Sequence, residues 1–190
     1  MILDVLEEHL SEAAFLWAHW ERANVAANYT LDEAAEVEAR LLAHLDGLVT
    51  AGPSAIAFLV PKVQEGEDPG EAFAAAWALL VLAPSLVLEA MKARAIDAPV
   101  AVQFAMTRAL ELGEAAVVES ALAPWLITAE SIPLSLALNA LGFHGRLSVD
   151  RALQLLGHPE GMVVAAALRA LKPSPKHQAP KELGACSDIS

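Results

Sequence analysis

The chain contains almost no cysteine and few aromatic residues, and both shortages narrow the range of possible folds. Cys186 is the single cysteine among 190 residues, so no internal disulfide can form and we expect a reducing, cytoplasmic environment. Aromatic residues make up 5% of the chain, although 56% of it is hydrophobic. Alanine, leucine and valine must therefore supply the core. This favours an all-helical protein, because alanine and leucine are strong helix formers.

Basic residues are also scarce, and they are unevenly placed. Residues 1–71 contain 14 acidic and 3 basic residues, a net charge of −11, whereas residues 72–190 contain 10 acidic and 9 basic residues, a net charge of −1. Nucleic-acid binding requires a basic surface that displaces counterions, so we expect no nucleic-acid partner. The acidic half is explained either by solvation alone or by attraction of a basic partner protein.

Signals for export and for membrane insertion are missing as well. Glu7 and Glu8 stand where a secretory signal would be positively charged, so we expect no signal peptide. An uncharged run of 17 residues extends from Ala72 to Leu88. A membrane-spanning helix needs about 20 apolar residues, and Pro84 interrupts this run. We therefore expect the end of one helix and the start of the next, and no membrane span.

A small residue followed by leucine recurs at a nearly constant interval along the chain. Successive leucines are separated by 31, 31, 31 and 30 residues. In a chain without strand alternation, this period predicts stacked helical hairpins that bury their apolar faces against one another. Residues three and four positions before each pair extend the same buried stripe, which in the first repeat would include Ala43 and His44. The pairs are Gly47-Leu48, Ala78-Leu79, Ala109-Leu110, Ala140-Leu141 and Ala170-Leu171.

Start signals divide the chain into alternating helices. Thr30 and Glu33 have the spacing of a capping box, and Asp68 followed by Pro69 marks another helix start. Lys172-Pro173 ends the periodic part, so we predict one helical domain over residues 1–172 and a disordered polar tail over 173–190. The first helix of each later hairpin is expected at about 54–64, 84–95, 114–126 and 148–156.

Residues 158–171 resemble the second-helix pattern of short HEAT-like repeats. The resemblance extends over residues from about 30 to 171 and implies an all-α fold, a right-handed α-solenoid of about five HEAT-like helical hairpins. The chain departs from the pattern in two respects. Arg40, Glu71 and Pro133 stand at the usual valine position, and the customary arginine after that position is missing from every repeat.

The opening segment carries a second resemblance. Trp17, Trp20, Tyr29 and residues 38–48 are similar to a segment of uncharacterised proteobacterial proteins with HEAT-like repeats, which are often encoded near type VI secretion components. The similarity implies a cytoplasmic accessory role. Such relatives are generally longer than this chain.

Catalytic patterns are not found. The six histidines include no His-x-x-x-His pair, and the chain has no phosphate-binding glycine loop and no nucleophile elbow. His44 on the expected buried stripe is either a tuned acid or base, or a core histidine bonded to a neighbouring helix, and we favour the second interpretation. We therefore expect no enzymatic activity, no catalytic residue, no cofactor and no metal site.

The second helices carry candidate partner-binding residues on the face opposite the packed stripe. In the early repeats that face is apolar, and a helix that is apolar all round is either buried or faces a partner. One interpretation is that the N-terminal helix, with Trp17 and Trp20, covers it. The other is a hydrophobic trough for a partner helix or a basic protein. The candidates are Glu36, Arg40, Leu42, Leu45, Phe73, Trp77, Leu80, Phe104 and Arg108.

Three functions remain open at this point. The leading hypothesis is a non-catalytic interaction scaffold or adaptor, with type VI secretion as a candidate context. The alternative is an immunity-type inhibitor whose acidic half blocks a basic toxin, and an enzyme with an unrecognised site comes third. If the fifth hairpin is the last, its apolar edge lacks a polar capping repeat. We then expect self-association through this edge, or a continuation of the array.

Overall fold

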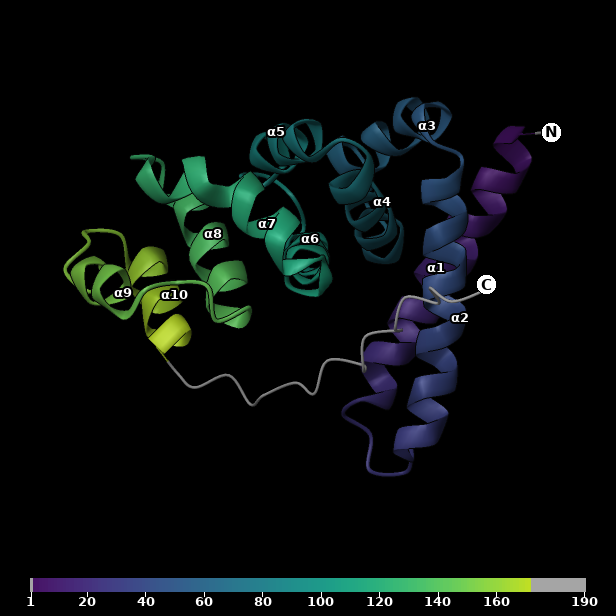
Figure 1. Ribbon diagram of the computed structural model, residues 1–190, viewed down its shortest axis with the longest axis horizontal. Helices are drawn as coiled ribbons and strands as arrows, with labels where there is room; N and C mark the ends of the chain where they lie inside the picture. Colours follow the sequence, from purple (N-terminus) through teal and green to yellow (C-terminus); the bar gives the residue numbers. More distant parts are fainter. Residues whose placement is uncertain (1, 172–190) are drawn as a thin grey trace, which may run out of the picture.

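The computed structural model describes residues 2–171, and the regular secondary structure of this part of the chain is all helical (Figure 1). It contains ten α-helices, one 3-10 helix and no strand. The all-α prediction is confirmed, whereas the predicted tail, residues 173–190, lies outside the described residues. The helices are α1 (Ile2–Ala23), α2 (Leu31–Thr50), α3 (Pro53–Gln64), α4 (Pro69–Leu82), α5 (Pro84–Arg94), α6 (Val100–Leu112), α7 (Ala115–Leu122), the 3-10 helix η1 (Ala123–Ile127), α8 (Ser131–Phe143), α9 (Val149–Leu155) and α10 (Gly161–Leu171).

The start signals in the sequence act as expected. The Glu33 carboxylate accepts a hydrogen bond from the Thr30 backbone N–H at 2.8 Å, and the Thr30 hydroxyl accepts one from the Glu33 N–H at 3.2 Å. These bonds complete the capping box and lower the pKa of Glu33. The Asp68 carboxylate caps the start of α4, accepting a hydrogen bond from the Glu71 N–H at 2.8 Å. Each later hairpin begins within a few residues of the predicted position.

The helices pack in two neighbouring rows, preceded by a pair of long helices. α4, α6, α8 and α10 contact one another in succession, and α3, α5 and α7 contact one another beside them. α1 and α2 pack along each other at the N-terminal end, and α1 also crosses onto α4. Because of this crossing, α1 determines how much of the α4 and α6 surface reaches solvent.

The recurring leucines lie at the centre of this packing. Leu48, Leu79, Leu110 and Leu141 are at most 1% exposed, while Leu171 at the end of α10 is half-buried. The expected stripe is wrong in the first repeat, where Ala43 is exposed. α2 packs along α1 through a stripe of residues three and four positions apart, which turns Ala43 away from the core. That stripe comprises Ala34, Val37, Leu41, Leu45 and Leu48.

Two helix crossings depend on glycine. A Cβ atom at Gly70 of α4 would lie 2.7 Å from the Ala14 carbonyl oxygen of α1, and one at Gly142 of α8 would lie 2.5 Å from the Ala170 Cβ of α10. Distances this short would force the helices apart. The small residues therefore allow close packing, as their recurrence in the sequence suggests.

The lengths and compositions of the helices bear on whether any of them could cross a membrane. Within residues 2–171, no single helix is both long and apolar enough to cross one. α2 and α3 together satisfy the length and composition requirement, but they are bent by 116° at the break between them.

We predict that replacing a recurring leucine destabilises the fold strongly. Leu110→Ala removes a side chain that is fully buried, and the cavity should lower the free energy of unfolding by about 2–5 kcal/mol. Leu86→Ala is the control, because Leu86 is 42% exposed. This substitution should lower the free energy of unfolding by less than about 1 kcal/mol. Urea unfolding followed by circular dichroism measures both. Equal losses in the two variants would contradict the buried position of Leu110.

Candidate functional site

The N-terminal helix α1 covers part of the face that the sequence marks as partner-binding. Trp17 and Trp20 of α1 are 4% and 5% exposed. The Trp17 indole stacks on the Phe73 ring of α4, with ring centroids 4.7 Å apart and planes within 9°. An aromatic stack of this kind adds about 0.5–1.5 kcal/mol to the burial of both rings. Of the two interpretations of this face, cover by the N-terminal helix is therefore the one that holds for Phe73.

Three of the candidate residues do not face outward, so that expectation is wrong for them. Leu45, Phe73 and Leu80 are 1%, 1% and 2% exposed. Leu45 lies on the buried stripe of α2, and Phe73 lies beneath Trp17. Leu80 packs near the turn between α6 and α7, where a Cβ at Gly113 would lie 3.3 Å from its Cδ1 atom. None of the three can contact a partner without a rearrangement of the core.

The remaining candidates do not form one continuous face. Trp77 is half-buried, and Glu36, Arg40 and Leu42 on α2 are exposed. Leu42 and Arg40 are two residues apart and therefore point about 160° away from each other around the helix axis. Phe104 is 51% exposed on α6 and lies near α1, with its ring centroid 6.3 Å from that of Trp17.

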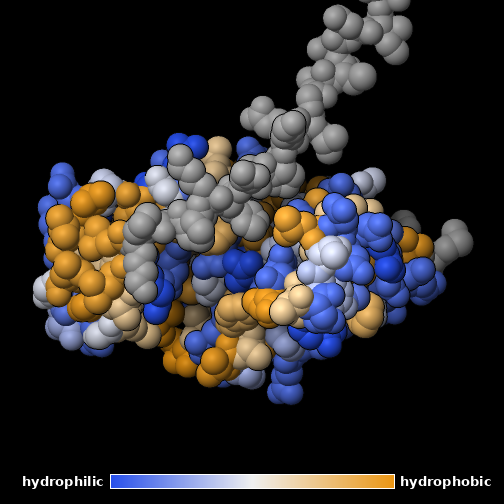
Figure 2. Space-filling model, turned by 90° about the horizontal axis from the view of Figure 1, so that it is seen from below, coloured by the Kyte–Doolittle hydropathy of each residue, from blue (hydrophilic) through white to orange (hydrophobic). Residues whose placement is uncertain are grey.

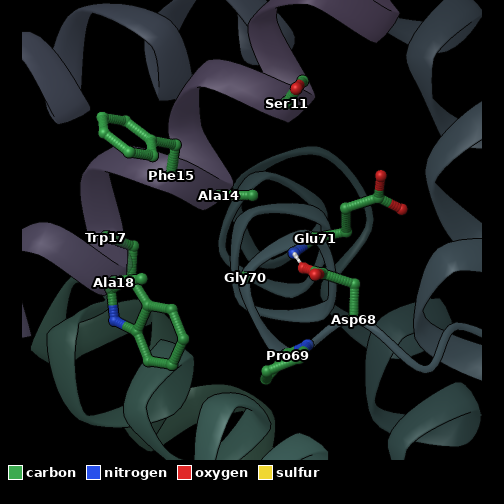
Figure 3. Close-up of a pocket in the computed structure, with 9 residues that line it drawn as sticks. All are labelled: Ser11, Ala14, Phe15, Trp17, Ala18, Asp68, Pro69, Gly70 and Glu71. Atoms are coloured by element: carbon green, nitrogen blue, oxygen red, sulfur yellow. Dashed lines mark hydrogen bonds between the residues drawn. The ribbon is translucent and has the colours of Figure 1, made fainter.

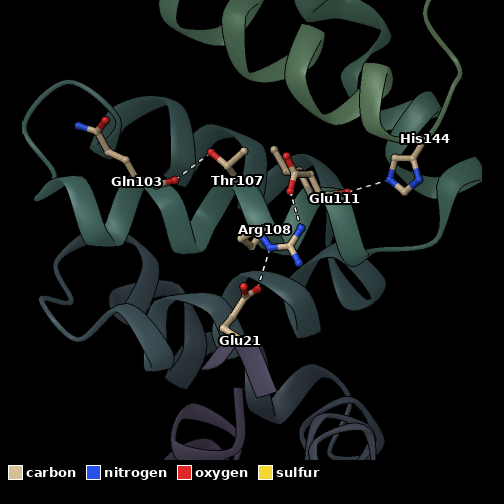
Figure 4. A network of polar contacts seen from close by, with 7 residues as sticks. Glu21, Gln103, Thr107, Arg108, Glu111 and His144 are labelled. Carbon is tan, nitrogen blue, oxygen red and sulfur yellow. Dashed lines mark hydrogen bonds and ion pairs between the residues drawn. The ribbon is translucent and has the colours of Figure 1, made fainter. Parts of the chain in front are cut away.

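Arg108 of α6 is bound within the chain rather than free for a partner (Figure 4). Its Nε donates to Glu21 of α1 at 2.7 Å, and one terminal nitrogen donates to Glu111 at 2.7 Å. The guanidinium also lies 5.9 Å from the Trp20 ring centroid and 5.8 Å from that of Phe143. Burial tends to lower the pKa of Arg108, but the hydrogen bonds to Glu111 and Glu21 outweigh it and raise the pKa. The network therefore holds α1 against α6.

A hollow of about 310 Å³ opens between α1 and the start of α4 (Figure 3). The Phe15 and Trp17 rings lie on one side of it, and the Asp68 and Glu71 side chains lie on the other. Phe15 is 58% exposed. Glu71 also forms an ion pair with Lys62 at 2.7 Å. The α1–α4 hollow is lined by Ser11, Ala14, Phe15, Trp17, Ala18, Asp68, Pro69, Gly70 and Glu71.

The chemistry of the α1–α4 hollow suits a cation on an apolar stem. A lysine or arginine side chain can lay its methylene groups on an aromatic ring and direct its charge to a carboxylate. Sequence reasoning missed Phe15, Asp68 and Glu71 as site residues. One signal was present: Phe15 is a large apolar residue beside, rather than on, the stripe of α1 that contains Leu6, Leu10 and Trp17.

The opposite end of the molecule carries a separate apolar surface. Figure 2 shows hydrophobic side chains gathered at the end formed by α9 and α10. Leu153, Met162 and Leu168 are 51%, 47% and 51% exposed there. This is the edge at which the sequence predicts self-association or a continuation, and both stay predictions.

A second hollow, of about 340 Å³, lies between the ends of α5, α8 and α10. Its charged residues include Lys92 and Glu130, whose side chains form an ion pair at 2.5 Å. Hydrogen bonding to Glu130 raises the pKa of Lys92. No group of three or more His, Cys, Asp or Glu residues among residues 2–171 is placed to hold a metal ion.

Comparison with protein families, curated proteins and solved structures finds no match to this chain. The geometry of the site is therefore the basis for a functional proposal.

We predict that Arg108 stabilises the docking of α1. Arg108→Met leaves Glu21 and Glu111 facing each other without a cation, and should lower the free energy of unfolding by about 1–3 kcal/mol. Adding Glu21→Gln should recover part of this loss, because it removes one of the two unpaired carboxylates. Urea unfolding of the single and double variants checks both expectations.

Arg22→Met is the matched control for this prediction. Arg22 is an exposed residue of α1 whose Nε donates to the Ala18 carbonyl within its own helix. Its replacement should change stability by less than about 0.5 kcal/mol. An Arg108→Met variant as stable as Arg22→Met would show that the network does not hold α1.

Proposed function

We propose that this chain is a right-handed α-solenoid of five HEAT-like hairpins that binds another protein and has no catalytic role. The α1–α4 hollow, together with Phe104 beside it, is the proposed binding surface. The partner presents a segment with basic residues on one side and apolar residues on the other. A cytoplasmic adaptor fits this description, and an accessory role in type VI secretion stays a prediction from the resemblance alone.

The observation that carries the proposal is the exposure of aromatic rings beside carboxylates. Phe15 on α1 and Phe104 on α6 are 58% and 51% exposed, whereas Trp17 is buried. Phenylalanine is enriched at protein interfaces, where aromatic side chains bury a large apolar area. Both are phenylalanines without a polar group, so their exposure has no hydrogen-bonding explanation.

The net charge of the N-terminal part determines the sign of the charge that a partner should carry. Residues 1–71 carry a net charge of −11, and this range includes α1, α2, α3 and the start of α4. A field of this sign attracts a basic segment and accelerates its association, at a rate that falls with salt. The ion pair between Lys62 and Glu71 neutralises only part of this charge.

The solenoid arrangement is supported by the order of the contacts. α4, α6, α8 and α10 pack in sequence, and each contributes a recurring leucine. The shorter α3, α7 and α9 pack on α4, α8 and α10, respectively. This is the contact order of a repeat array in which every unit touches its neighbours. Its handedness follows from the proposed relation to HEAT-like repeats.

An acidic inhibitor of a basic toxin is the second candidate. The net charge of −11 over residues 1–71 favours it, because such inhibitors use charge to associate rapidly and tightly. It would use the same acidic surface as the adaptor. The two candidates differ in the strength of binding and in how steeply it falls with salt.

The proposal predicts a specific outcome when peptides from a displayed library are selected on the full chain. Enriched peptides should carry several Lys or Arg residues together with aromatic or aliphatic ones. Their affinity should fall as salt increases, because the attraction is partly electrostatic. Phe15→Ser and Phe104→Ser should each weaken the best peptide by roughly tenfold or more, as measured by fluorescence anisotropy.

Ile127→Ser is the control variant, since Ile127 is 86% exposed in η1, away from the α1–α4 hollow. It should leave peptide affinity unchanged. Selection of neutral or acidic peptides would contradict the proposed partner chemistry. Equal binding to the parent and the Phe15→Ser and Phe104→Ser variants would contradict the proposed surface.

A further inference from the structure

The helices α1 and α2 meet through a pair of histidines that the proposed function does not use. The Nδ1 atoms of His9 and His44 lie 3.2 Å apart, and the two ring centroids are separated by 5.2 Å with planes inclined at 64°. One imidazole donates its Nδ1–H and the other accepts. His44 is thus bonded to a neighbouring helix, as the favoured interpretation expects, but it is half-buried rather than part of the core.

The absence of a side chain at Gly47 leaves room for the His9 ring beside His44. A Cβ atom at Gly47 would lie 2.5 Å from His9 Cε1, and 2.7 Å from both His9 Nδ1 and His9 Nε2. The His9 ring therefore lies directly against the backbone of α2. Glycine inside a helix costs about 1 kcal/mol relative to alanine. The other four repeats have alanine at this position before the recurring leucine. An alanine at position 47 would collide with His9, which explains why glycine stands there despite its cost.

We propose that the Nδ1 atoms of His9 and His44 together bind a divalent transition-metal ion, such as Zn²⁺, Ni²⁺ or Cu²⁺. Imidazole nitrogens hold zinc at about 2.0–2.1 Å in a tetrahedral arrangement. That geometry places two ligand nitrogens about 3.3–3.4 Å apart. The two Nδ1 atoms, at 3.2 Å, already have nearly this separation. To bind the ion, the two rings rotate so that both Nδ1 lone pairs point to it rather than to each other.

The surroundings of the pair suit such an ion. Both side chains are half-buried, so water can complete the coordination. Imidazole donors favour zinc, nickel and copper over magnesium and calcium. For both Nδ1 atoms to bind metal, the imidazole that donates in the free pair moves its proton to Nε2. The net charge of −11 over residues 1–71 favours the cation.

The site is distinct from a structural zinc centre with four protein ligands. Within residues 2–171 the pair is not part of any larger cluster of His, Cys, Asp or Glu suited to a metal. Two protein ligands and water give weaker binding than four. The bound ion cross-links α1 to α2, and its effect on stability follows from mass action, rising with the ratio of free metal to the dissociation constant.

Thermal unfolding of the untagged full chain with and without ZnCl2 tests the proposal. All variants carry Cys186→Ser, so that the lone thiol cannot bind the ion. Zinc should raise the Tm of this parent, and EDTA should reverse the rise. Titration calorimetry should give one ion per chain.

His9→Gln and His44→Gln should each abolish the rise in Tm. His19→Gln is the matched control on the same helix, because His19 Nε2 is hydrogen-bonded to the Tyr29 hydroxyl at 2.8 Å rather than to another histidine. The His19→Gln variant should show the same zinc-dependent rise in Tm as the parent. No rise in the parent, or an equal rise in the His9→Gln and His44→Gln variants, would overturn the proposal.

A second measurement keeps the proposal testable if a glutamine variant folds poorly. Electron paramagnetic resonance of the parent with one equivalent of Cu²⁺ should show splitting from two imidazole nitrogens. Gly47→Ala, whose Cβ displaces the His9 ring, should remove one of them. A parent spectrum without two nitrogen ligands, or an unchanged spectrum in Gly47→Ala, would overturn the proposal.

Discussion

The docking of α1 across α2 and α4 is the contact on which the rest of the structure depends. The recurring hairpins leave an apolar surface on α4 and α6 that no later helix covers. Trp17 of α1 fills part of it by stacking on Phe73, and Gly70 lets the two helices approach. Arg108 then bonds Glu21 and ties α1 to α6. Without this helix, the first hairpins would expose much of their core.

The same docking shapes the proposed binding surface. Because α1 covers Phe73 and leaves Phe15 and Phe104 partly exposed, the apolar area available to a partner is narrow rather than a broad trough. The carboxylates of Asp68 and Glu71, at the start of α4, adjoin it. A narrow apolar surface with acidic neighbours selects for a partner with both basic and apolar side chains, which is a more specific requirement than hydrophobicity alone.

Much of the fold is predictable from the sequence because local signals and packing signals agree. The capping box at Thr30 and the Asp68-Pro69 start act within a few residues, so no tertiary information is needed to identify them. The recurring leucines are a reliable sign of burial, because the same position in successive hairpins packs against similar neighbouring helices. The first repeat is the exception: its partner is the long helix α1, and α2 therefore packs on a different stripe that exposes Ala43.

The candidate site was harder to predict for a physical reason. Whether an apolar helix face reaches solvent depends on which distant helix covers it, and periodicity within one helix does not contain that information. Phe73 and Leu80 thus have the same sequence signature as Phe104, but only Phe104 is exposed. Phe15 belongs to the site because of where α1 crosses α4, and His9 meets His44 because of the crossing of α1 and α2.

Hydrogen–deuterium exchange of Trp17→Ala against the parent chain tests the central claim most directly. If α1 is held on α4 by this side chain, amide exchange should accelerate in α1 and α4 while α8 and α10 keep their protection. A uniform acceleration along the whole chain, or unchanged protection in α4, would contradict the account of α1 as the cover of this face.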